Sequence, residues 1–182
     1  VMGISTKIQD TILLIRINND IFINLNDAGP YHTRFIKKIC KPFKRKFLLS
    51  ISGWGDADMI NFYDHNDKFI EPLAAKKHPV GDYLSLVAKT YDANYVIPFS
   101  SFHEYQREDS VWANKYVTPI HEYKNGFHKN LNFIEPFTFV DSLKDDNFKS
   151  LNLKKNEFKV KKPEQFGDNW SDILDKNDKK II

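Results

Sequence analysis

Four short apolar runs constrain what this chain can fold into more than any other feature of its sequence. They cover residues 11–17, 20–25, 46–52 and 95–99 and are rich in Ile, Leu, Val and Phe. Runs of this length and composition are typical of β-strands. They are too apolar for a sheet with one face in water. Each strand must therefore be covered on both faces, or on one face by something outside this chain.

The segments between these runs predict a hairpin and two helices. Asn18 and Asn19 separate the first two strands and suit a two-residue type I′ turn. Thr33 is a candidate N-cap for a helix over 34–40, and a helical pattern over 82–90 leads into the fourth strand. The apolar face expected for the first helix consists of Phe35, Ile36 and Ile39.

This alternation predicts an α/β, or α+β, fold in which a mixed β-sheet carries helices on one face. The length of 182 residues is enough for one domain with its own core, which we place at residues 1–140. Residues 141–182 are rich in Lys, Asp and Asn with scattered apolar residues. We expect them to form a polar C-terminal extension that packs on the body.

Charge and cysteine content favour a soluble, cytoplasmic protein. No apolar run approaches the roughly 18 residues of a membrane span, and the first residues show no signal-peptide pattern, so we expect no membrane partner. The single cysteine, Cys40, excludes an intrachain disulfide and fits a reducing compartment. Position 1 is Val rather than Met, which is consistent with an excised piece or an incomplete reading frame.

A nucleic-acid partner is not favoured by the charge distribution. The formal net charge is only +3, and acidic residues are interspersed with Lys along most of the chain. One local basic cluster is the exception, and we interpret it as the solvated end of a helix and its following turn. A nucleic-acid-binding alternative would use this cluster, which consists of Lys37, Lys38, Lys41, Lys44, Arg45 and Lys46.

Asp27 and His103 are the candidate metal ligands. Each follows an apolar strand, and the ends of parallel strands gather at one edge of a sheet. A carboxylate and an imidazole suit zinc, iron or manganese. Two ligands do not hold a catalytic metal, and the other histidines form no compact ligand pattern. We therefore expect this chain alone to bind zinc or iron weakly or not at all.

Two further segments are candidates for contact with a small-molecule substrate. In the loop after the third strand, Trp54 lies between two glycines, and Asp56 and Asp58 follow the second of them. Arg107 and Trp112 belong to a charged, aromatic stretch that follows His103. Loops at strand ends often carry function because a rigid scaffold positions them.

Nucleophilic and phosphate-binding sites find little support. Ser100 and Ser101 lie too close to His103 in sequence for a catalytic triad, and no G-x-S-x-G motif is present. Cys40 lies on the apolar side of a helix end and is better explained as a core residue. The chain has seven glycines and no phosphate-cradling glycine loop.

The order of these elements resembles the C-terminal half of a metallo-β-lactamase-fold protein. The similarity rests on Asn26-Asp27 at a strand end and on the run from Pro98 to His103, and it covers about residues 10–120. The branch that it most resembles contains the ascorbate-phosphate lactonases and the CMP-sialic-acid hydroxylases. The resemblance implies a metal-dependent hydrolase with one or two metal ions, in which Asp27 is a bridging ligand and His103 a later one.

The chain lacks the H-x-H-x-D-H motif of that superfamily, which belongs to the N-terminal half. The resemblance therefore implies half of an αβ/βα sandwich that is inactive alone. We expect a partner at the apolar sheet face, either the missing N-terminal half or a second copy of the chain. Two alternatives remain open: a sugar-nucleotide hydroxylase-like oxidoreductase of the same fold, and a non-catalytic binding domain.

Overall fold

The computed structural model of the chain describes residues 2–5, 11–26, 28–51, 63–71, 79–99, 102–144, 148–151 and 157–167. The chain divides into two compact units. The first comprises residues 1–103 and 116–154, and the second comprises residues 104–115 and 155–182. The boundary predicted after residue 140 falls within the first unit.

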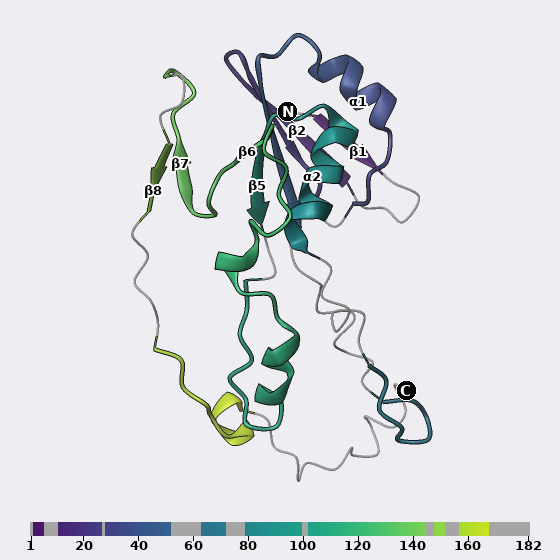
Figure 1. The fold of residues 1–182 in the computed structure, drawn as a ribbon, viewed down its shortest axis with the longest axis vertical. Coiled ribbons are helices and arrows are strands. Elements are labelled where there is room, and N and C mark those ends of the chain that lie inside the picture. The colour runs from purple at the N-terminus through teal and green to yellow at the C-terminus, as the bar shows by residue number, and fades with distance from the viewer. Residues whose placement is uncertain are drawn as a thin grey trace, which may run out of the picture. The chain divides into compact units, whose positions relative to one another are not determined.

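A mixed sheet of six strands forms the centre of the first unit (Figure 1). Its strands lie in the order in which they occur along the chain. The second strand is antiparallel to both the first and the third, whereas the third to the sixth run parallel to one another. The strands are β1 (Met2–Ser5), β2 (Thr11–Ile17), β3 (Asp20–Asn24), β4 (Arg45–Ile51), β5 (Tyr95–Phe99) and β6 (Asn132–Phe133).

The two α-helices in the described part of this unit connect its parallel strands and pack on the same face of the sheet. Helix α1 (Thr33–Cys40) joins β3 to β4, and α2 (Val80–Tyr91) joins β4 to β5. Their buried side chains form one core with alternate residues of the strands. The core includes Leu14, Ile23, Leu48 and Val96 from the sheet, and Ile36, Leu84 and Tyr91 from the helices. The predicted α+β fold with helices on one face is confirmed.

Three local predictions need correction. A type I′ turn requires a positive φ at both central residues, but of Asn18 and Asn19 only Asn18 has one, at 53°. Thr33 is not the N-cap of α1, since the helix begins at this residue. The residue before the helix is His32, which adopts a left-handed conformation. Phe35 is 52% exposed, so the apolar face of α1 consists instead of Ile36, Ile39 and Cys40.

The opposite face of the sheet is also apolar, as its sequence predicts. At its centre the Phe47 ring stacks on Phe22 and Tyr95, with centroid separations of 4.6 and 4.7 Å. A two-stranded sheet of β7 (Thr138–Val140) and β8 (Phe148–Ser150) covers these rings. Phe148 of β8 meets Phe47 edge-on at 6.4 Å. The chain therefore covers part of this second face itself, with residues on both sides of the predicted domain boundary.

The first turns of helix α2 pack very closely on the backbone of residues 125–128. The Gly81 N–H donates to the Asn125 carbonyl at 3.1 Å, and the Ser85 hydroxyl accepts from the His128 N–H at 2.9 Å. A Cβ at Gly81 would lie 2.6 Å from the Phe127 nitrogen and still closer to the Asn125 carbonyl oxygen. These neighbours are backbone atoms, which cannot move aside as a side chain can.

We expect Gly81→Ala to lower the free energy of unfolding by about 1–3 kcal/mol, the usual cost of overpacking. Alanine would otherwise stabilise a helix by up to about 1 kcal/mol relative to glycine, so the clash decides the sign. Urea denaturation followed by circular dichroism measures the change. Lys89→Ala, at an exposed position of the same helix, is the control and should change the stability by less than about 0.5 kcal/mol. If Gly81→Ala is as stable as the parent chain, the backbone of residues 125–127 does not lie as close to Gly81 as the structure shows.

The second unit contains two shorter segments joined by backbone hydrogen bonds. The Glu108 N–H donates to the Lys161 carbonyl, and the Lys161 N–H donates to the Gln106 carbonyl, each at 2.8 Å. The unit includes most of the 3₁₀ helix η3 (Val111–Tyr116) and all of η5 (Pro163–Phe166), whereas η4 (Ile120–Glu122) belongs to the first unit. In the described part of the chain, no helix has the length and apolarity needed to cross a membrane.

Candidate functional site

The carboxyl ends of the parallel strands lie at one edge of the sheet. β3 and β5 flank β4, and both run parallel to it. The segments that follow β3 and β5, which carry Asp27 and His103 in the sequence, therefore leave the sheet at the same edge. The Asn26 N–H donates to the Asn24 side-chain oxygen at 2.9 Å, and Asn26 adopts a left-handed φ of 48°. This turn ends β3 immediately before position 27.

His103 is held at this edge by its neighbour in sequence. The ring of Phe102 contacts the rings of Tyr123 and Phe137, each with a centroid separation of 5.7 Å. Tyr123 is fully buried. His103 itself is half-buried, and its Nε2 atom is buried. An imidazole in this setting is positioned by the core, as a metal ligand or proton carrier must be.

The described residues do not form a metal centre by themselves. None of the described His, Cys, Asp and Glu side chains gather in a group of three or more that could hold a metal ion. Asp27 lies outside the described residues, as do the predicted substrate contacts Trp54, Asp56 and Asp58. Of the residues predicted for the metal site, His103 is thus the one that the structure places. A three-ligand zinc site would need donors beyond it.

Arg107 and Trp112, predicted to contact substrate, belong to the second unit and bind a common residue there. The Arg107 Nε and Nη2 atoms donate to the Asp109 carboxylate at 2.8 and 2.6 Å. These hydrogen bonds lower the pKa of Asp109 to about 2. The Trp112 indole N–H donates to the Asp109 carbonyl at 2.7 Å. Both side chains thus stabilise a local turn, and their contact with a substrate remains a prediction.

The structure separates the predicted basic cluster into two groups. The four lysines of α1 and the turn after it are exposed, as predicted for a solvated helix end: Lys37, Lys38, Lys41 and Lys44. The other two cations belong to β4 and pair with carboxylates. Arg45 binds Asp20, and Lys46 contacts Asp92 at 2.5 Å. The cluster is therefore a smaller cationic surface than its sequence indicates.

Cys40 is a core residue, as predicted. Its side chain is buried among residues of the helix-covered face, and its exposed fraction is 1%. Burial raises the pKa of the Cys40 thiol to about 11. The thiol is therefore protonated at neutral pH and is not a nucleophile.

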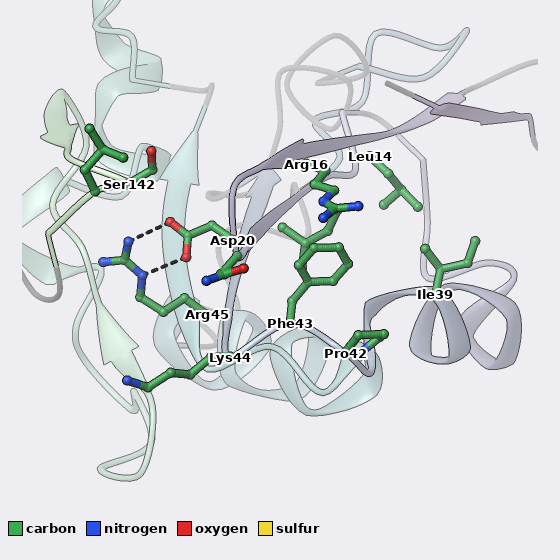
Figure 2. A pocket seen from close by; sticks show the side chains of 12 residues that line it. Leu14, Arg16, Asp20, Ile39, Pro42, Phe43, Lys44, Arg45 and Ser142 are labelled. Atoms are coloured by element: carbon green, nitrogen blue, oxygen red, sulfur yellow. Dashed lines mark hydrogen bonds and ion pairs between the residues drawn. The ribbon is translucent and has the colours of Figure 1, made fainter.

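A cavity that the sequence did not reveal lies at the opposite end of the parallel strands (Figure 2). Its volume is about 1010 Å³. The lining comes from the end of β2, the β2–β3 turn, the beginnings of β3 and β4, the α1–β4 connection and residues 142–143. The residues are Leu14, Arg16, Asn19, Asp20, Ile21, Ile39, Pro42, Phe43, Lys44, Arg45, Ser142 and Leu143.

A buried ion pair forms one wall of this cavity. The Arg45 Nε and Nη2 atoms donate to the two Asp20 carboxylate oxygens at 2.8 and 2.7 Å. The two side chains are only 5% and 3% exposed. The Arg45 Nη1 atom also donates to the Lys144 carbonyl at 3.0 Å. The pair thus joins the beginnings of β3 and β4 to the segment that leads from β7 to β8.

Arg16 lies over the other wall, which is apolar. Its guanidinium carbon is 5.6 Å from the centre of the Phe43 ring, and its Nε donates to the Asn18 carbonyl at 3.3 Å. Figure 2 shows the Arg16 side chain beside the Phe43 ring, with Leu14 and Ile39 nearby. Arg16 lies on the same face of β2 as the buried residues Ile12 and Leu14, at the exposed end of that strand.

Comparisons with known proteins give no further identification. No family model matches this chain, and no curated protein or solved structure is detectably similar to it.

Proposed function

We propose that this chain supplies one layer of a metal-dependent hydrolase of the metallo-β-lactamase superfamily, and contributes Asp27 and His103 to its metal centre. The observation that carries the proposal is the parallel arrangement of β3, β4 and β5. It brings the chain segments after β3 and β5 to one edge, where parallel sheets place their functional groups. The anchored, half-buried His103 provides one ligand there. The remaining ligands would come from the second layer.

The second face of the sheet supports a partner at this layer. Beyond the rings that β7 and β8 cover, this face presents apolar residues that are half-buried or exposed. Ile17 of β2, for example, is 42% exposed. A row of such side chains on neighbouring strands is an apolar surface that a second layer would remove from water. The half-buried ones are Leu13, Ile15, Leu49, Ile51 and Phe99.

Metal binding tests the proposal. We expect the purified chain to bind zinc at one weak site, because two protein ligands leave most of the coordination sphere to water. Asp27→Ala and His103→Ala should each abolish this binding in a competition titration with a chromophoric chelator. His121→Ala, in which an 81% exposed histidine is removed, is the matched control and should bind zinc like the parent. Binding that survives both Asp27→Ala and His103→Ala would refute the shared site.

Two alternatives remain. The first is a non-catalytic binding domain that keeps the scaffold, in which Asp27 and His103 are ordinary polar residues. It predicts no zinc site that depends on Asp27 and His103 together. A sugar-nucleotide hydroxylase-like oxidoreductase would use iron at the same edge, and the same variants titrated with ferrous iron distinguish it from a zinc hydrolase by metal preference.

A further inference from the structure

We propose that the cavity at the beginnings of β3 and β4 binds a small amphiphilic anion, with an apolar body and one terminal oxyanion, a carboxylate or a phosphate. Arg16 would hold the oxyanion, and the wall around Phe43 would take the body. This site lies at the edge of the sheet opposite to the proposed metal centre and uses none of its residues. The two proposals can therefore fail independently.

The size and lining of the cavity suit such a molecule. A volume of about 1010 Å³ is at the upper end of the range of about 300–1,000 Å³ typical of small-molecule sites. Half of the lining residues are apolar, and three of them surround one recess: Leu14 is buried, and Ile39 and Phe43 are half-buried. An aliphatic or aromatic body placed there would leave water without displacing the core.

The charge of the lining selects an anion. The lining includes the cations Arg16, Lys44 and Arg45 and one carboxylate, Asp20. Arg45 binds both oxygens of that carboxylate, so the pair contributes no net charge. The lining thus holds more cations than carboxylates, and the exposed lysines of α1 lie on the helix that contributes Ile39 to the wall. The cavity is thus positive on balance, which favours a negatively charged ligand and opposes a cationic one.

Arg16 is held in place for this role. Its Nε atom donates to the Asn18 carbonyl, and its guanidinium lies over the Phe43 ring. None of the ion pairs between described residues includes Arg16. The two terminal amino groups of a guanidinium form a planar fork that matches a carboxylate or phosphate bidentately. The Arg16 side chain is exposed, so a ligand that enters the cavity can reach its terminal amino groups from solvent.

Isothermal titration calorimetry with three ligands of one chain length tests the proposal: decanoate, decyl phosphate and uncharged decanol, each as monomers in solution. We expect one equivalent of anion to bind, and decanol to bind at least about tenfold more weakly, because it makes no charged hydrogen bond. The ratio between decanoate and decyl phosphate identifies the preferred oxyanion. This comparison needs no variant.

Arg16→Gln locates the site. It should weaken anion binding at least about tenfold and leave decanol binding unchanged. Arg34→Gln removes an exposed cation from α1 that does not line the cavity, so it controls for net charge and should bind the anions like the parent. Equal binding of decanol and decanoate, an equal loss in the two variants, or no binding of either anion would each overturn the proposal.

Discussion

Replacing Asp20 with asparagine should lower the free energy of unfolding by about 3–5 kcal/mol, the usual cost of leaving one member of a buried ion pair without its partner. Arg45 would keep its charge in a place where its side chain is 5% exposed. Arg45 also donates to carbonyls of the segment at residues 141–144, so we expect the same substitution to weaken the attachment of that segment to β4. Chemical denaturation monitored by circular dichroism measures the loss.

Asp92→Asn is the matched control for this prediction. This substitution also takes away the carboxylate partner of a β4 cation, Lys46. The Asp92 side chain, however, is 67% exposed. Solvent screens such a pair, so we expect a loss below about 1 kcal/mol. Asparagine also tolerates the left-handed φ of 56° at this position. If Asp20→Asn costs no more than Asp92→Asn, the ion pair is not buried as the structure indicates.

Phe47→Ala should be equally severe, with a loss of about 3–5 kcal/mol. The Phe47 side chain is fully buried between the rings of Phe22, Tyr95 and Phe148. Its removal leaves a cavity that those rings cannot fill without shifting. Because Phe148 belongs to β8, we also expect faster amide hydrogen exchange in β7 and β8, measured by mass spectrometry.

Phe139→Ala, at a 58% exposed position of β7, controls for the loss of an aromatic side chain from the same region. A surface substitution of this kind should change the stability by less than about 0.5 kcal/mol. If Phe47→Ala destabilises the chain but leaves the exchange of β7 and β8 unchanged, the small sheet does not cover the second face in solution.

The prediction with the greatest functional consequence is the loss of zinc binding on replacing Asp27 or His103. The cavity at the other end of the strands offers an independent line of evidence. Anion binding there would show that the chain is a binding domain in its own right, whether or not a second layer completes a metal centre. Zinc binding without anion binding would instead assign the functional role to the carboxyl edge alone.

The sequence by itself determined where the four central strands lie, but it did not predict β1, β6, β7 or β8. β2 begins and ends at the residues predicted, and β3, β4 and β5 differ from the predicted runs by one residue at most at either end. Short, β-branched apolar runs and Asn or Pro breaks are local signals that need no tertiary information. The apolar residues on both faces of these strands also indicated that a second cover was needed. β7 and β8 supply part of it.

Only the tertiary structure decided which polar residues meet. Asp20 and Arg45 lie 25 positions apart, and neither belongs to a recognisable motif. They face each other because β3 and β4 run parallel in a register that pairs these two positions. Arg16 and Phe43 likewise meet because α1 returns the chain to the end of β2. Strand register and helix packing are set by the whole core, so no local pattern could predict the cavity that they form.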